Sequence, residues 1–245
     1  MSIKTFPKVT IGISTCLLGE NVRYDGGHKR DRFITDTLAK YMTFQPVCPE
    51  MGSGMSTPRP PIRLAGNPED PKVLGVDDPT RDVTHQIERY SKRQVKQLGD
   101  ISGYILKKDS PSCGMTRVKV YPLKGGAAER KGVGVFARYL LNQHPHLPVE
   151  DEGRLNDPVL RENFITRIFV YRHWQDLIND GLTPAALIDF HAQHKYLVMA
   201  HSQAAYKRMG QLLSHVPKSA LKSVSEQYID ELMTALKRPV NKKGH

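Results

Sequence analysis

The chain has 245 residues, of which 39% are hydrophobic and 25% charged, and its formal net charge at pH 7 is +11. No apolar run is long enough to span a bilayer and the first residues lack the apolar core of a signal peptide, so we expect a cytoplasmic protein without membrane contact. The three cysteines, an odd number in a reducing compartment, argue against a disulfide framework, and the basic excess favours phosphate-rich partners.

The first 155 residues alternate strand-like and helix-like stretches, which predicts an α/β, doubly wound fold with a mostly parallel, Rossmann-like sheet. Residues 51–64 are too rich in glycine and proline for a helix or an inner strand, and residues 66–82 are typical of a short ribbon with turns. The expected strands are 9–14, 43–47, 101–106, 117–121 and 147–150, and the expected helices are 32–41, 80–98 and 125–142.

From residue 157 onward no strand pattern remains. A long helical pattern runs over 159–177, after which Thr183 is a candidate helix cap and Pro184 a first helical residue. That next helix should continue to about residue 215, and a third should cover 218–236. We therefore divide the chain into an α/β domain over 1–155, a connecting helix over 156–182 and a helical domain over 183–245.

The three cysteines lie in similar local settings. Cys16, Cys48 and Cys113 each follow a strand-like run, directly or after a short polar loop. Because the loops after parallel strands open on one edge of a sheet, the three thiols can surround one small object. A 4Fe–4S cluster normally takes four cysteines, so three would leave one iron open as a thiophilic Lewis acid for substrate sulfur. A structural zinc site completed by His28 and plain core cysteines stay open as alternatives.

Polar residues near the cysteines are candidates for catalysis. Glu50 follows Cys48 by two residues and could deliver or take protons. Ser110 and Ser112 precede Cys113 and could position water or a pyrimidine carbonyl. Taken one at a time, the carboxylate could equally be an ion-pair partner and the serines a turn.

A phosphate site is expected beside the same loops. The paired glycines 26 and 27 allow backbone N–H groups to approach an anion, and a helix should start near Asp31. A turn with a solvated basic rim is the competing interpretation. The candidate phosphate-binding cations are Arg23, Lys29, Arg30, Arg59, Arg63 and Lys107.

Three motifs in order resemble those of the thiouracil desulfidase family, over about residues 8–150: 14–19 with 22–26, 48–50 with 58–64, and 110–114. The resemblance implies an oxygen-sensitive 4Fe–4S cluster held by Cys16, Cys48 and Cys113, with Glu50 as the acidic residue of the second motif. It implies that Ser110 or Ser112 acts, without deciding between them. It further implies removal of sulfur from thiouracil without net redox change, in which the free iron captures the sulfur and water supplies the oxygen.

The stretch 190–202, with Tyr206, resembles a helical domain often fused behind this catalytic domain. The fused form is similar to bacterial desulfidases that act on 4-thiouridine in tRNA, where the helical part helps to bind RNA. Chains of that type usually continue beyond residue 245, so we expect an incomplete helical domain with reduced RNA affinity. Read from its residues, the domain has an excess of lysine and arginine that can track phosphates or form a solvated helix face.

These observations together predict a desulfidase that converts 4-thiouridine in tRNA to uridine. Three alternatives remain. The first is a desulfidase of free thiouracil or another small thioamide. The second is a non-enzymatic nucleic-acid-binding protein with a structural Cys-rich metal site, and the third is a redox iron–sulfur protein.

Overall fold

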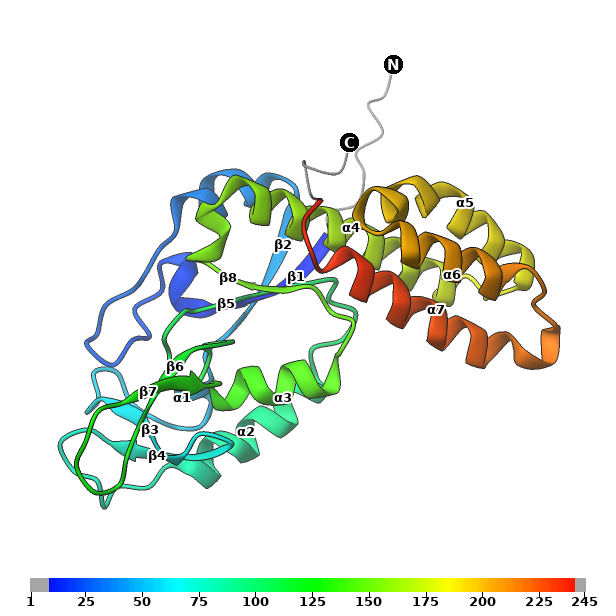
Figure 1. Cartoon of the computed structure of the whole chain (residues 1–245). Helices are drawn as coiled ribbons and strands as arrows, with labels where there is room; N and C mark the ends of the chain where they lie inside the picture. Colours follow the sequence, from blue (N-terminus) through cyan, green and yellow to red (C-terminus); the bar gives the residue numbers. More distant parts are fainter. Residues whose placement is uncertain (1–8, 241–245) are drawn as a thin grey trace. The chain divides into compact units, whose positions relative to one another are not determined.

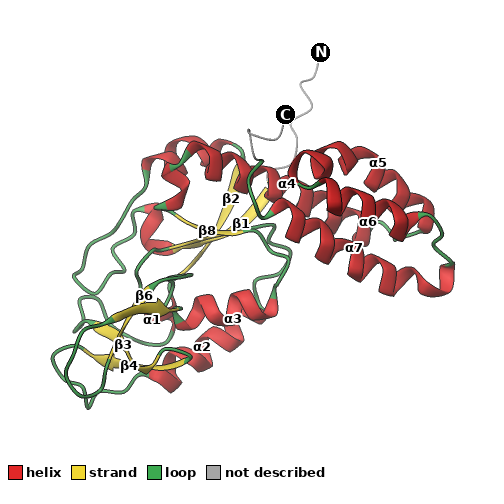
Figure 2. Ribbon diagram, viewed as in Figure 1, coloured by secondary structure: helices red, strands yellow, loops and turns green. Residues whose placement is uncertain are grey.

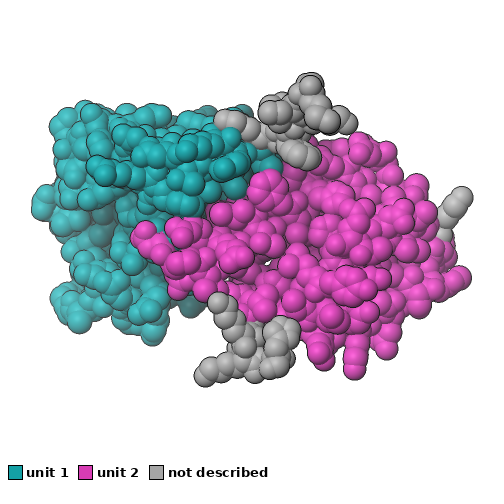
Figure 3. Space-filling view, turned by 90° about the horizontal axis from the view of Figure 1, so that it is seen from above, with its two compact units in different colours: residues 1–145, 149–155 teal, residues 146–148, 156–245 magenta. Residues whose placement is uncertain are grey.

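The computed structural model describes residues 9–240 and divides the chain into two compact units. One unit contains residues 1–145 and 149–155 and has an α/β fold, and the other contains 146–148 and 156–245 and is helical (Figure 1). Figure 2 separates helices from strands, and Figure 3 colours the two units. The predicted fold class, an α/β unit followed by helices, is confirmed.

The first sheet of the α/β unit is entirely parallel. Its order is β2 (Met42–Val47), β1 (Val9–Ser14), β5 (Tyr104–Leu106) and β8 (Val149–Asp151). Strand β1 lies inside the sheet, and its isoleucines are fully buried, as its apolar sequence predicts. Because all four strands run the same way, the segments that follow them emerge at one edge.

The second sheet is mixed. Its order is β4 (Asp70–Gly75), β3 (Ile62–Asn67), β6 (Val118–Tyr121) and β7 (Glu129–Gly132), and only the pair β3–β6 is parallel. One face of this sheet packs on the helices α2 (Thr84–Lys96) and α3 (Val135–Gln143) (Figure 2). The buried contact residues are Leu64, Val73, Ile87, Val118, Val120 and Val135. The expected mostly parallel sheet therefore describes the first sheet, and the second adds antiparallel pairs.

Several predicted elements are wrong in detail. The helix expected over 32–41 is a π-helical turn, Phe33–Thr37, followed by a 3₁₀ turn, Leu38–Lys40. The helix expected over 125–142 is β7 followed by α3, because the first half pairs with β6 and the positive φ angles of Gly125 and Gly126 form the turn between them. A helical turn that was not expected, α1 (Pro49–Gly52), follows Cys48 with proline at its first position.

The helical unit contains α4 (Pro158–Asn179), α5 (Pro184–His201), α6 (Gln203–Leu213) and α7 (Leu221–Leu236). Thr183 caps α5 as predicted, since its Oγ1 accepts the N–H of Ala186 at 3.1 Å. The single helix expected over 184–215 is broken at Ser202, whose backbone is extended and whose Oγ caps α6.

Helix α4 belongs to the helical unit rather than serving only as a connection. Its residues Val170 and Trp174 are buried in the same core as Phe190 of α5 and Tyr228 of α7. Trp174 stacks on Tyr228 with ring centroids 5.7 Å apart. Among residues 9–240, no helix is both long and apolar enough to cross a bilayer.

Candidate active site

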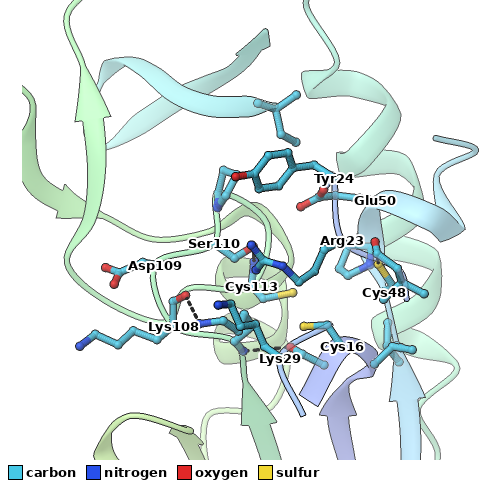
Figure 4. A pocket seen from close by; sticks show the side chains of 18 of the residues that line it. Cys16, Arg23, Tyr24, Lys29, Cys48, Glu50, Lys108, Asp109, Ser110 and Cys113 are labelled. Atoms are coloured by element: carbon cyan, nitrogen blue, oxygen red, sulfur yellow. Dashed lines mark hydrogen bonds between the residues drawn. The ribbon is translucent and has the colours of Figure 1, made fainter. Parts of the chain in front are cut away.

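A cavity of about 420 Å³ lies where β1, β2 and β5 end (Figure 4). Its wall contains Cys16, Cys48 and Cys113. Cys16 lies in the 3₁₀ turn Thr15–Leu18 after β1, Cys48 directly follows β2, and Cys113 lies in the loop after β5. The structure thus brings together the three thiols that the sequence places in separate loops.

The three thiols are free, and Figure 4 shows the sulfur atoms of Cys16 and Cys113 pointing toward each other. Burial raises the pKa of Cys16 to about 11, and the nearby Cys48 thiolate adds to that rise. Burial likewise raises the pKa of Cys48 and, well above its usual range, that of Cys113. Crowded thiols of high pKa become stable thiolates when a cation binds them, so the set has the chemistry of a metal ligand set.

The geometry fits a cluster better than a single ion. Within residues 9–240, no group of three or more His, Cys, Asp and Glu side chains could hold a metal ion. The proposed zinc ligand His28 is exposed, does not line the cavity, and accepts the N–H of Arg30 through Nδ1 at 3.1 Å. A 4Fe–4S cube binds each cysteine through a different iron, so its ligands surround a space rather than converge on a point. With three cysteines in the chain, one iron of such a cluster would carry no cysteine.

Glu50 forms one side of the cavity and is held at both carboxylate oxygens. Oε2 accepts from Nε and Nη2 of Arg59 at 3.0 and 2.5 Å, and Oε1 accepts from Oγ of Ser112 at 2.9 Å. The carboxylate therefore has a fixed position beside the thiols.

The guanidinium of Arg59 is buried and hydrogen-bonds to other residues of the protein. Its side chain is 3% exposed, and besides Glu50 it donates to the carbonyl oxygens of Val22 and Ser56, each at 3.0 Å. This arrangement favours positioning of Glu50 over the predicted contact with substrate phosphate.

The other predicted cations separate into two groups. Arg23, Lys29 and Lys107 line the thiol cavity, where Lys107 pairs with Glu152. Arg30 does not line this cavity and pairs with Asp36 at 2.7 Å. Arg63 lies over the ring of Tyr121, at 4.9 Å from its centroid, in an adjacent cavity.

The two candidate serines have different surroundings. Ser110 lines the cavity, and its Oγ accepts the N–H groups of Ser112 and Cys113 at 3.1 and 3.0 Å. Ser112 is fully buried and donates to Glu50. The first hydroxyl therefore shapes the loop and faces the cavity, whereas the second orients the carboxylate.

Two residues of the site were not predicted from the sequence. Ser14, the last residue of β1, accepts the N–H of Lys107 at 2.9 Å and hydrogen-bonds the sulfur of Cys113, which opposes the rise in that thiol's pKa. Tyr24 is 43% exposed and lines the cavity (Figure 4). The position of Ser14 at the carboxyl end of a buried strand was a signal available in the sequence; nothing comparable marks Tyr24.

Comparison with protein families places the site within a known group. A family model described as 2-thiouracil desulfurase matches residues 11–152, which include all three cysteines. A second model, described as a protein of unknown function (DUF1722), matches residues 195–245.

Individual relatives cover different parts of the chain. "Uncharacterized protein YbbK" of Bacillus subtilis (strain 168) is 34% identical over 154 residues, 59% of this chain and 97% of that protein. "Uncharacterized protein YbgA" of Escherichia coli (strain K12) is 29% identical over 85 residues, 34% of this chain and 50% of that protein, so the chain spans half of that relative. A solved structure described as "[4Fe-4S]-dependent thiouracil desulfidase TudS" has 31% identity, covers 61% of this chain and 95% of its own, and gives a TM-score of 0.49.

Proposed function

This chain belongs to the 2-thiouracil desulfurase family, and from that premise we propose that it converts 4-thiouridine in tRNA to uridine with a 4Fe–4S cluster held by Cys16, Cys48 and Cys113. The observation that carries the proposal is the single cavity in which three thiols lie beside a fixed carboxylate. When bound, the cluster supplies an iron without a cysteine ligand, a Lewis acid that can bind the thio sulfur and polarise the C–S bond.

The reaction is an exchange without net oxidation or reduction. The oxygen of one water forms a bond to the pyrimidine carbon and the C–S bond breaks. Sulfur leaves with both protons of that water as hydrogen sulfide, or with one of them as HS⁻ while the other proton is released to solvent. The residues of the chain must therefore accept a proton from the attacking water and return one to the departing sulfur.

We assign that proton transfer to Glu50. Because Arg59 and Ser112 hold its two oxygens, the carboxylate keeps one orientation beside the thiols. Ser110 accepts two backbone N–H groups, so its own hydroxyl proton can be donated into the cavity, to the water or to the pyrimidine carbonyl.

The helical unit supports tRNA as the substrate. Its exposed cations include Lys207, Lys222, Lys237 and Arg238, and its segment 195–245 matches the DUF1722 model. Cations spread over helices bind the phosphate backbone through counterion release, without reading sequence. Lys242 and Lys243, which belong to the lysine and arginine excess of the sequence, lie outside the described residues.

The test is the 4-thiouridine content of bulk tRNA after anaerobic incubation with the purified protein. We expect the content to fall and sulfide to appear in equal amount, and Glu50→Gln to slow the loss by about a hundredfold or more. Cys16→Ala, Cys48→Ala and Cys113→Ala should each abolish turnover and lower the bound iron. Unchanged tRNA with a fully loaded cluster would reject the tRNA substrate.

A desulfidase of free thiouracil is the second candidate. The cavity of about 420 Å³ can hold a single pyrimidine ring, and thiouracil is the substrate in the family's description. Turnover of thiouracil, 4-thiouridine and tRNA under the same anaerobic conditions separates the two candidates, since the tRNA enzyme should prefer the polymer.

A further inference from the structure

Tyr104 is a fully buried tyrosine beside the segments that carry the thiols. It is the first residue of β5 and does not line the thiol cavity. Its register partner on β1 is Gly12, and a Cβ on that glycine would lie 2.2 Å from Cδ2 of Tyr104. The ring therefore lies against the backbone of β1, in space that a glycine leaves open.

The ring of Tyr104 contacts two segments that lead to cysteines. Strand β1 continues directly into the 3₁₀ turn that contains Cys16. The ring also packs against Phe136 of α3, with ring centroids 5.6 Å apart. The N–H of Phe136 donates to the carbonyl oxygen of Ser112, the residue before Cys113, at 2.9 Å. Tyr104 is thus part of the structure that supports the ligand loops from below the cavity wall.

The hydroxyl group of Tyr104 is an orphaned polar group. Its oxygen is buried and has no hydrogen-bond partner within the described range 9–240. Leaving a buried hydroxyl unpaired destabilises a fold, and nearly all buried polar groups of native proteins have a partner. A hydroxyl held in this way is therefore expected to acquire its partner from a group that binds to the protein.

The electrostatic surroundings of this hydroxyl favour an anionic acceptor at the thiols. Burial raises the pKa of Tyr104 well above its usual range. The thiolates of Cys113, Cys48 and Cys16 raise that pKa further, and the effect of Cys113 is the largest of the three. The hydroxyl therefore keeps its proton and lies within electrostatic range of all three sulfurs. A protonated phenol can donate one hydrogen bond.

We propose that the hydroxyl of Tyr104 donates a hydrogen bond to an anionic sulfur of the bound 4Fe–4S cluster, on the side of Cys113. Hydrogen bonds to the sulfurs are among the factors that set the reduction potential of such clusters. The bond withdraws electron density from sulfur, which favours the reduced form and strengthens iron as a Lewis acid. The inference rests on the cluster site proposed above, but it does not depend on tRNA as the substrate.

Redox titration of the full-length, anaerobically purified and cluster-loaded protein tests this hydrogen bond. In Tyr104→Phe we expect the ratio of reduced to oxidised cluster at a fixed potential to fall about tenfold, which corresponds to about 59 mV for a one-electron couple. The substitution removes only the hydroxyl, so the ring keeps its packing against Gly12 and Phe136. Tyr139→Phe is the matched control, since Tyr139 is half-buried on α3 and does not line the thiol cavity.

Urea unfolding provides a second measurement that does not depend on the potential. Without the cluster, Tyr104→Phe should raise the urea midpoint, because it removes an unpaired buried hydroxyl. With the cluster bound, that gain should disappear or reverse, because the wild-type hydroxyl then has its acceptor.

Three results would overturn the proposal: an unchanged potential in Tyr104→Phe, the same shift in Tyr139→Phe, or an equal gain in stability with and without the cluster. A wild type that binds no iron would reject the cluster site itself and this inference with it. Since no measurement uses tRNA or thiouracil, failure of the desulfuration assay would leave these results unaffected.

Discussion

At the scale of single residues, the site depends on the carboxylate of Glu50, whose orientation is fixed by hydrogen bonds. One oxygen of Glu50 accepts from Arg59 and the other accepts from Ser112. The guanidinium of Arg59 also donates to the carbonyl oxygens of Val22 and Ser56. The Arg59 side chain is nearly inaccessible, so its charge is compensated mainly by Glu50. Removing one partner of such a pair leaves an uncompensated buried charge, which costs about 3–5 kcal/mol.

Arg59→Lys keeps the charge but not the geometry. A lysine cannot donate to Glu50, Val22 and Ser56 from fixed planar positions, so we expect the free energy of unfolding to fall by about 1–3 kcal/mol and turnover to drop. Urea unfolding and anaerobic turnover measure the two effects, with Arg89→Lys on the surface as control. A variant as stable and as active as the wild type would show that the fork of hydrogen bonds is dispensable.

Alanine substitutions separate the two serines. Ser112→Ala removes a donor from Glu50, so turnover should fall while the iron content stays constant. Ser110→Ala leaves the N–H groups of Ser112 and Cys113 without their acceptor, which should loosen the loop and reduce retained iron. Iron analysis and kcat on the same preparations test both. Identical behaviour of the two variants would contradict the division of roles.

The sequence predicted which residues line the site, but not the hydrogen bonds that fix their positions. The cysteines and Glu50 could be predicted because each follows a strand of a parallel sheet, which fixes the edge where it lies. The contact of Arg59 with Glu50 depends on the path of a loop rich in glycine and proline, which has no periodicity. The same limit explains why Arg30 was grouped with the site although it pairs with Asp36 elsewhere.

At the scale of elements, the loop that carries Cys113 rests on the start of α3. The carbonyl oxygen of Gly114 accepts the N–H of Gly134 at 2.7 Å, and that of Ser112 accepts the N–H of Phe136 at 2.9 Å. A Cβ on Gly134 would lie 2.6 Å from the carbonyl carbon and oxygen of Ser112 and 2.8 Å from the nitrogen of Cys113. Glycine is therefore required for this close approach of two backbones.

Gly134→Ala should displace the thiol of Cys113. We expect a loss of about 1–3 kcal/mol in unfolding free energy, as for other overpacked sites, together with reduced iron retention. Gly210→Ala is the matched control, because nothing lies within 4 Å of its added Cβ and it is inside α6. That variant should gain about 0.5–1 kcal/mol. Full iron content in Gly134→Ala would show that the loop adapts without moving the sulfur.

The errors in element prediction have physical causes. Residues 125–142 have helix-like apolar spacing, yet 129–132 form a strand because β6 offers a pairing edge, and partners distant in sequence override local preference. The break between α5 and α6 comes from Ser202, which satisfies the N–H of Ala205 with its own side chain. Thr183 and Pro184 were identified correctly because a cap and a first-turn proline are local signals.

At the scale of the whole molecule, the helical unit has its own hydrophobic core, and a tryptophan in that core can report its unfolding by fluorescence. The only tryptophan of the chain, Trp174, lies in that core beside Phe190 and Tyr228. His194 stacks on Phe190, with ring centroids 4.3 Å apart, and faces His173 at 5.1 Å. Burial lowers the pKa of both His191 and His194 below the ordinary value of 6.5. The charge of Lys195 lowers the pKa of His191 further, and the neighbouring His173 lowers that of His194.

The helical unit should lose stability as the pH falls. A histidine whose native pKa is lowered binds fewer protons when folded than when unfolded, so stability is full above pH 6.5 and declines below it. The urea midpoint followed by Trp174 fluorescence should therefore be lower at pH 5 than at pH 7.5. His194→Gln should reduce that difference, and His85→Gln, on an exposed residue of α2, should not. A midpoint that rises toward acid would contradict the burial of these imidazoles.

The thiols come from segments that are far apart along the chain, and this sets an order of assembly. No pair of them is a short local motif, and Cys113 is in place only once α3 has docked against its loop. A nascent polypeptide must therefore emerge past residue 151, the end of β8, and form its parallel sheet before it can receive iron and sulfide. A zinc finger folds only when its metal binds. In this protein, by contrast, the α/β unit must fold first, so that the three cysteines already form a site when the iron and sulfide are delivered.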